Sequence, residues 1–414
     1  MEIPASQCES FGSITYSDTY KGLETSTTST TYAEGYNLLI GKYVSVMDGQ
    51  SKFYVVEATS ESAKIIDATY GPVNPSGEIE AILASTEDDY GTSYYYRGAV
   101  ENNYLVFAGM CWRIVRVDGL GNTKLTLYNY NPTGASNPCA ANLDGDSMAF
   151  ARLMAGDTNS YTSVFNVNGK QNAYIGYMYG TPGSSTYDSE HANTTDSTIL
   201  SNLKGWYDRV FTSAQKEMLA DVIWCNDKRV VSDTSYDPLN TITNVLGTGI
   251  GRDKTYYQAS QRLITYNSIT GKYDTSEASP SLKCGESKED NKISKFTAST
   301  STDGGYGNGA LNGYKIGLLT ADELAFAGST TNTNLPNYPY YLIKNTNHWY
   351  WTMSPNNFEV NGELAYIWGV SGMGFLTYDA VISDGLCLRP SVSLKSTASI
   401  SSGTGTQENP FIVS

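Results

Sequence analysis

The stretch from His348 to Leu394, HWYWTMSPNNFEVNGELAYIWGVSGMGFLTYDAVISDGLCLRPSVSL, is the most informative part of the chain for its fold. Its apolar residues come in short runs, and Gly, Asn or Asp interrupts each run. That pattern is typical of short strands joined by irregular loops. The runs expected to form strands lie at 364–370, 374–376, 380–382 and 391–394. The Ser354-Pro355 pair ahead of them predicts a turn.

Large side chains stand between the turn residues of this stretch, where a soluble protein seldom places them unless they make a contact. We predict a ligand-binding surface here, and flat aromatic faces would suit either sugar rings or a protein partner. Because alternation along a strand must direct some side chains inward, core packing is the competing interpretation for each residue. The predicted contact residues are Asn357, Glu363, Tyr366, Trp368, Met373, Phe375, Tyr378 and Asp379.

The composition excludes some classes of partner. The 414 residues contain 27 Lys and Arg against 42 Asp and Glu, a formal charge of −15. Nucleic acid is therefore excluded as a partner, since no basic stripe exists to neutralise phosphates. The sequence contains no run of 18 apolar residues, so it predicts no membrane span. The 33 tyrosines favour a recognition surface, although tyrosine also fills half-buried strand positions.

Six cysteines without any C-x-x-C pair, and only two histidines, favour a disulfide framework over a zinc site. Such a framework indicates an oxidising compartment, so we expect a secreted or cell-surface protein. Six cysteines allow 15 pairings. The preferred bonds are Cys111–Cys139, Cys225–Cys284 and a bond joining the two ends, Cys8–Cys387.

The pattern along the chain predicts an α+β protein with few helices and long loops. Asp48-Gly49 between alternating apolar runs predicts a hairpin. The predicted organisation has four parts: an extended Ser/Thr-rich arm at 1–35, a small β-meander at 36–85, a mixed domain at 86–395 with a polar insert at about 226–311, and a tail with a short strand at 396–414.

Three helices are predicted from periodicity and capping signals. The first follows Ser197 and carries apolar residues at helical spacing between 199 and 210. Thr212 with Gln215 forms a capping-box pattern ahead of a helix over 216–224, and Thr320 with Glu323 repeats the pattern ahead of a helix that ends at Gly328.

Five motifs follow one another along the chain: VFAGMCWRIVR (106–116), WCND (224–227), GLLTADE (317–323), YWTMSP (350–355) and LRPSVSL (388–394). In this order they resemble an uncharacterised domain family that is widespread in secreted and surface proteins of Gram-positive gut bacteria. The match covers roughly residues 97–395. Its last motifs also resemble the C-type-lectin-like fold of formylglycine-generating enzymes and of the variable ligand-binding proteins of diversity-generating retroelements.

The resemblance implies a scaffold whose strands support a loop-rich binding face at 356–383. It also implies framework roles for Trp351, Ser354, Pro355, Arg389 and Pro390. The chain departs from the pattern by carrying Cys387 where a small or polar residue is expected. It also lacks the paired active-site cysteines of the formylglycine-generating enzymes in this stretch, which argues against that activity.

Catalytic and metal-binding signals are weak. His191 lies in a polar loop and is expected to be solvated, while His348 precedes three aromatic residues and is expected to pack or to contact a ligand. The acidic pairs Asp88-Asp89 and Asp144/Asp146 are expected to be surface acids, although a pair across a cleft would serve a glycosidase. We predict no cofactor. Calcium is the one candidate, through Asp144/Asp146 or Glu87-Asp88-Asp89, but neither is an EF-hand.

We therefore predict a non-enzymatic, extracellular or cell-surface recognition protein that binds a host or bacterial surface glycan or protein through a C-type-lectin-like domain. Two alternatives remain open at this point. One is a structural subunit of a bacterial surface filament or appendage, which would self-assemble. The other is a glycan hydrolase, which would need two facing carboxylates in a pocket.

Overall fold

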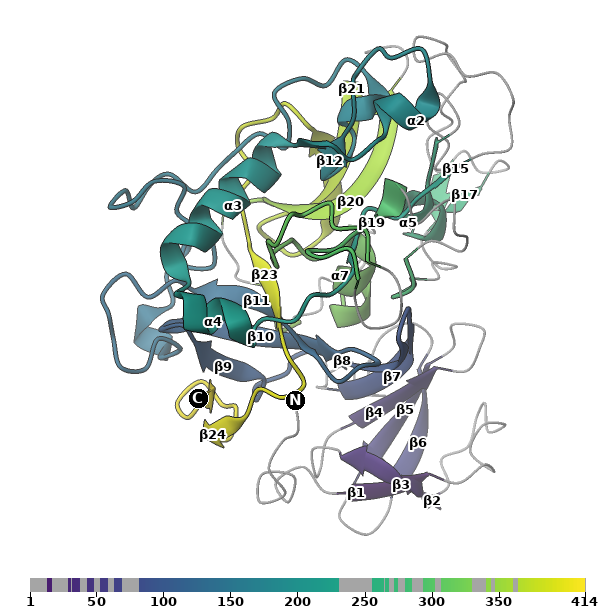
Figure 1. Ribbon diagram of the computed structural model, residues 1–414. Coiled ribbons are helices and arrows are strands. Elements are labelled where there is room, and N and C mark those ends of the chain that lie inside the picture. The colour runs from purple at the N-terminus through teal and green to yellow at the C-terminus, as the bar shows by residue number, and fades with distance from the viewer. Residues whose placement is uncertain are drawn as a thin grey trace.

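The computed structural model describes residues 82–230, 255–263, 265–267, 272–274, 280–284, 293–301, 307–329, 340–343, 347–359 and 364–413, together with the backbone of six strands between residues 13 and 68 (Figure 1). These residues contain five α-helices among many short strands in mixed sheets. The strand-rich α+β class with few helices is therefore confirmed. The boundaries of the four predicted parts remain predictions.

The largest element is a twelve-stranded mixed sheet (Figure 1). Its main path runs β2-β6-β5-β4-β7-β8-β10-β9-β25-β24, and β11 pairs with both β10 and β23. The strands are β2 (Ser29–Thr30), β4 (Tyr43–Met47), β5 (Phe53–Ala58), β6 (Ala63–Ala68), β7 (Ile82–Asp88), β8 (Gly91–Arg97), β9 (Tyr104–Phe107), β10 (Met110–Val117), β11 (Thr123–Asn129), β23 (Ser391–Leu394), β24 (Ile400–Ser402) and β25 (Phe411–Val413).

The predicted hairpin at Asp48-Gly49 is confirmed by the pairing of β4 with β5. The two strands are antiparallel, from Met47 opposite Phe53 to Tyr43 opposite Glu57. Strand β6 extends this meander on the far side of β5, and β4 pairs in parallel with β7. The meander and the following strands therefore belong to one hydrogen-bonded sheet.

Helix α3 (Thr198–Val210) covers the β9–β10 part of this sheet with its apolar face. Ser197 caps the helix as predicted, because its hydroxyl accepts from Leu200 N at 3.3 Å. The indole of Trp112 on β10 is fully buried against Trp206 and Phe211, with ring centroids 6.3 Å from each. Aromatic packing between the helix and the sheet forms the centre of the core.

Helix α4 (Ser213–Met218) begins with the predicted Thr212/Gln215 capping box but ends earlier than predicted. The expected helix over 216–224 is wrong beyond Met218. Ala220 N donates to Ser393 O at 2.8 Å, and Leu219 bridges to Leu394. Pairing with β23 therefore supplies the backbone partners that a longer helix would have needed, and the next residues lead into β14 (Trp224–Cys225), which pairs with β19 (Lys295–Phe296).

A second sheet contains β20 (Tyr350–Glu359), β21 (Leu364–Val370) and β22 (Leu376–Ala380) in that order. The turn predicted at Ser354-Pro355 is wrong, because both residues lie inside β20. The pairing register with β21 shifts on either side of Pro355. Such irregularities are where a sheet tolerates proline, which has no N–H to donate to the ladder.

The strand that follows β21 also differs from the prediction. Two separate strands were expected at 374–376 and 380–382. Instead a single strand, β22, runs from Leu376 to Ala380, and residues 374–375 and 381–382 lie in the turns on either side of it. Ser371 N donates to Phe375 O at 2.9 Å, and Gly374 adopts φ 89° to close this turn. Because a left-handed residue is needed there, the run containing Gly374 cannot be extended strand.

The remaining elements are short. They are the two-stranded pairings of β1 (Ser13–Tyr16) with β3 (Tyr32–Asn37), β12 (Met178–Tyr179) with β13 (Thr195–Asp196), β15 (Lys228–Val230) with β16 (Thr255–Tyr257) and β17 (Thr265–Asn267) with β18 (Lys272–Asp274), and the helices α2 (Tyr187–Glu190), α5 (Gln258–Leu263) and α7 (Ala321–Ala327).

Two of the three predicted disulfides are confirmed, Cys111–Cys139 and Cys225–Cys284. The third, Cys8–Cys387, is wrong, because Cys387 is a free and fully buried thiol, while Cys8 lies outside the described residues. Cys387 pairs through its backbone with Trp349, and burial raises the pKa of its thiol to about 12. A partner cysteine would have to enter the core to reach it.

The Cys111–Cys139 bond is expected to contribute measurably to stability because it closes 28 residues of the unfolded chain. Replacing both cysteines with serine should lower the free energy of unfolding by about 3 kcal/mol. Urea denaturation measures this change. Unchanged stability in the double variant would contradict the assignment of this bond as a structural constraint.

Candidate functional site

The first turn of α7 lies between the large sheet and the β20–β22 sheet, and its residues contact both (Figure 1). Thr320 and Glu323 form the predicted capping box, and Gly328 ends the helix with φ 127°. The free N–H of Ala321 donates to Ser354 Oγ on β20 at 2.9 Å. The start of this helix is thereby fixed to the second sheet.

Glu323 is the centre of a buried ion cluster with the large sheet. Its carboxylate accepts from Lys124 Nζ at 2.6 and 2.8 Å and from Arg116 Nε at 3.0 Å, and Arg116 also pairs with Asp88 at 2.7 Å. Burial alone would raise the pKa of Glu323, but the charges of Lys124 and Arg116 outweigh burial and lower that pKa to about 2. Glu323 is therefore ionised throughout the physiological range.

Asp322, the neighbouring residue, connects α7 to α5 and to the segment 280–284. Its carboxylate accepts from Arg262 Nε and Nη2, each at 2.8 Å, and from Ser281 N at 2.9 Å. Arg262 also pairs with Asp227, next to the second disulfide. One arginine is thus held between two carboxylates from different parts of the chain.

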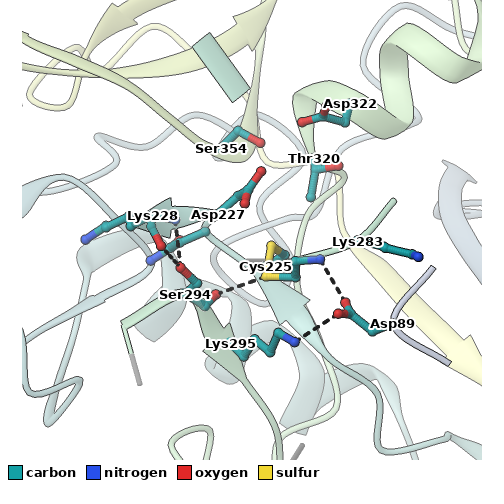
Figure 2. The surroundings of a disulfide bond; sticks show 12 residues. Asp89, Cys225, Asp227, Lys228, Lys283, Ser294, Lys295, Thr320, Asp322 and Ser354 are labelled. Carbon is teal, nitrogen blue, oxygen red and sulfur yellow. Dashed lines mark hydrogen bonds and ion pairs between the residues drawn. A yellow bond between two sulfur atoms is a disulfide. The ribbon is translucent and has the colours of Figure 1, made fainter. Parts of the chain in front are cut away.

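A hollow of about 600 Å³, counted to include solvent at its mouth, lies beside this turn and is lined by both cysteines of the Cys225–Cys284 bond. Figure 2 shows Asp89 on one side of the disulfide, where it accepts from Lys295 Nζ and from Cys284 N, each at 2.9 Å. Six carboxylates line the hollow, those of Asp88, Asp89, Asp118, Asp227, Asp322 and Glu323.

These carboxylates are occupied as hydrogen-bond acceptors. Five of the six take part in ion pairs with Arg116, Lys124, Arg262 or Lys295. The sixth, Asp118, accepts from Leu120 N and from both nitrogens of Asn122 at 2.8 to 3.0 Å. Burial raises the pKa of Asp89 and of Asp118, although these partners oppose the shift. The arrangement favours a structural role for the hollow.

The two acidic pairs that were predicted to lie at the surface differ in their burial. Asp88 and Asp89 were predicted to be surface acids, which is wrong, because Asp88 is 4% exposed and both line the hollow. Asp144 and Asp146 are exposed as predicted. In the described part of the chain, no group of three or more His, Cys, Asp or Glu side chains is placed to hold a metal ion.

The two histidines are packing residues in the described structure. His348 packs edge-to-face on Tyr161 and Phe150, with its ring centroid 5.2 and 6.0 Å from theirs, which agrees with the packing alternative of its prediction. The prediction of a solvated His191 is wrong, because this residue is 2% exposed and its ring lies 4.4 Å from that of Tyr187.

The predicted ligand-contact residues lie around the β20–β22 sheet. Asn357 on β20 is opposite Tyr366 on β21, and Trp368 is opposite Tyr378 on β22, so these four share one face. The rings of Tyr366 and Tyr378 meet edge-to-face at 5.7 Å, and Tyr378 is 39% exposed. An aromatic pair is thus presented at the surface of this sheet. We call Asn357, Tyr366 and Tyr378 the tyrosine face.

The other predicted contact residues are buried, lie elsewhere or fall outside the described residues. The exposed positions expected for Trp368 and Phe375 are wrong, because they are 1% and 7% exposed and belong to the buried interior. Met373 is exposed in the turn after β21, and Asp379 points to the opposite side of β22, where its Oδ1 accepts from Ala380 N and Ser383 Oγ. Glu363 lies outside the described residues.

Trp368 is buried because a distant segment covers it. Its Nε1 donates to Ser260 Oγ on α5 at 3.1 Å, and Ser260 Oγ donates in turn to Asn356 O at 2.7 Å. Alternation along β21 correctly assigns Trp368 to the face of Tyr366, but α5 comes from the polar insert about a hundred residues earlier. The sequence contains no local signal for that contact.

No protein-family model, curated protein or solved structure matches the chain. None of the helices within the described ranges combines the length and the hydropathy that a membrane span requires.

The Glu323 cluster makes a prediction about acid stability. Because the pKa of Glu323 is about 2 in the folded protein and 4.5 for the ordinary side chain, its contribution is complete above pH 4.5. It is lost as the pH falls from 4.5 toward 2. Glu323→Gln should lower the free energy of unfolding by about 3 to 5 kcal/mol at neutral pH, since it leaves Lys124 buried without its carboxylate.

Urea denaturation between pH 2 and 7 tests this prediction. The difference in stability between the parent and Glu323→Gln should shrink as the pH falls. The raised pKa values of Asp89 and Asp118 act in the opposite direction, but they are common to both proteins and cancel in the difference. Asp146→Asn, a change at an exposed acid, is the control. A difference that stays constant from pH 7 to 2 would refute the assignment.

Proposed function

We propose that this is an extracellular or cell-surface recognition protein that binds a glycan on the tyrosine face of the β20–β22 sheet. The observation that carries the proposal is that Asn357, Tyr366 and Tyr378 share one face, where two tyrosine rings meet at the surface. Two disulfides support an oxidising compartment.

The aromatic pair adjoins a buried tryptophan on the same face of the sheet. Trp368 lies 6.3 Å from Tyr378 between ring centroids and is itself fixed by α5 through its hydrogen bond to Ser260. A tyrosine held by its neighbours loses little conformational freedom when a ligand binds. The pair can therefore offer an apolar ring surface at low entropic cost, as sugar-binding aromatic residues must.

Asn357 adds a polar group to the tyrosine face. The residue is 5% exposed, and its Oδ1 accepts no hydrogen bond from the part of the chain that the structure describes, so this buried acceptor has no donor there. A sugar supplies hydroxyl donors at the edge of an apolar ring face, and this combination matches an acceptor beside two tyrosines. This match favours a glycan over an apolar protein segment as the ligand.

The proposal includes the C-type-lectin-like arrangement, in which the binding face precedes the final Arg-Pro pair. The implied framework residues have the burial that such roles require, with Trp351 at 1%, Ser354 at 0% and Arg389 at 1% exposure. The hydrolase alternative receives less support, because the carboxylates of the hollow are already engaged by cations or by backbone and amide donors.

A glycan array probed with the purified chain, followed by titration of the strongest glycan, tests the proposal. Tyr378→Ala should weaken binding at least tenfold, about 1.4 kcal/mol, because it removes the exposed ring. Tyr378→Phe keeps the ring and should retain most of the affinity. Asn357→Ala should also weaken binding. A glycan that binds all three variants as tightly as the parent would contradict the proposal.

Comparing Trp368→Ala with Tyr378→Ala distinguishes a residue of the buried core from a residue that contacts the ligand. Trp368 is buried, so its replacement should lower the free energy of unfolding by about 3 to 5 kcal/mol. Tyr378→Ala should cost less than about 1 kcal/mol, because its ring is partly exposed. Chemical denaturation of both variants measures the contrast, and equal losses would show that Tyr378 is a core residue rather than a contact residue.

A further inference from the structure

Of the buried arginines that form no ion pair with a described residue, two are the most deeply buried. Arg113 on β10 and Arg389 just before β23 are 2% and 1% exposed. Among the described residues, each donates only to neutral oxygen atoms and neither forms an ion pair. A buried charge without a counter-charge is costly, so the compensation for these two guanidinium groups has to be identified.

Arg113 is surrounded mainly by aromatic rings. Its guanidinium carbon lies 3.7 Å from the ring centroid of Tyr104, 5.6 Å from that of Tyr128 and 5.3 Å from that of Tyr341. Nη2 donates to Val100 O, while Nε has no acceptor. Cation–π contacts compensate part of the charge, but they leave one N–H unsatisfied.

Arg389 is held by main-chain oxygen atoms. Nε donates to Leu127 O at 3.0 Å and Nη1 donates to Leu342 O at 2.6 Å, with Tyr350 Oη at 3.4 Å. Nη2 has no acceptor. The framework role implied for Arg389 therefore explains the hydrogen bonds of Nε and Nη1. It leaves Nη2 able to donate to a further acceptor.

The two arginines are neighbours in space. Arg389 donates to residues 127 and 342, and the rings of the adjoining residues, Tyr128 and Tyr341, lie beside Arg113. Burial lowers the pKa of Arg113, and the nearby positive charge of Arg389 lowers it further. Tyr341 contributes a third buried group, since its Oη also has no partner. Three unsatisfied polar atoms thus belong to one interior cluster with two positive charges.

We propose that this cluster binds a small monovalent anion, a halide such as chloride, in contact with Arg389 Nη2 and Arg113 Nε. A halide accepts several hydrogen bonds at once, and it removes one of the two uncompensated charges, which a water molecule does not. A single atom also suits an interior position between side chains that are at most 2% exposed. The site is separate from the tyrosine face and does not depend on glycan binding.

Crystals grown or soaked in sodium bromide test the site directly in the full chain. We expect an anomalous bromine peak between Arg113 and Arg389, absent in crystals kept in sodium gluconate. A water molecule in that position, with no anomalous signal in bromide, would overturn the proposal.

Thermal unfolding supplies a test in solution. At fixed ionic strength the melting temperature should be higher in chloride or bromide than in gluconate, because the anion binds only the folded state. Tyr341→Phe, which removes one hydroxyl and keeps the ring, should reduce this difference. Tyr378→Phe is the matched control and should leave the difference unchanged. Equal melting temperatures of the parent protein in all three salts would contradict the proposal.

Discussion

The first turn of α7 is the junction on which the rest of the described structure depends. Thr320 caps the helix, Ala321 donates to Ser354 on β20, Asp322 binds Arg262 of α5, and Glu323 binds Arg116 and Lys124 of the large sheet. Three consecutive residues, 321 to 323, therefore contact three different parts of the chain, and Thr320 caps the turn that carries them. Because three of these contacts involve buried charged or polar groups, none can be lost without leaving an unsatisfied partner.

This junction determines what the two candidate sites can do. Its carboxylates form ion pairs in the acidic hollow, whose lining also includes both cysteines of the Cys225–Cys284 bond. Figure 2 shows Asp322 of this turn and Asp89 in the surroundings of that disulfide. Through Ser354 and α5 the junction also fixes β20 and covers Trp368, which leaves Tyr366 and Tyr378 as the outer part of that aromatic group. The exposed tyrosine pair therefore adjoins a buried part of the same face that polar contacts fasten to α5.

Sequence reasoning succeeded where the signal is local. The capping boxes at Thr212 and Thr320, the Asp48-Gly49 hairpin and two disulfides were predicted, because each depends on residues close in sequence or on cysteine spacing. The role of Glu323 as an ionic centre was missed, since Arg116 and Lys124 lie about two hundred residues away. For the same reason Trp368 was expected at the surface, because the α5 segment that covers it comes from about a hundred residues earlier. Pro355 was expected in a turn because Ser-Pro is a local turn signal, but it pairs with Ile367 of the neighbouring strand β21.

Hydrogen–deuterium exchange of the parent protein and of Glu323→Gln, compared at neutral pH, tests the role of this junction most directly. If the first turn of α7 connects both sheets, exchange should accelerate together in α7, in β11 and in β20, although β20 is not in contact with the substituted side chain. Faster exchange confined to residues 320–328, with β11 and β20 unchanged, would show that the two sheets are held together by other contacts and would contradict the account.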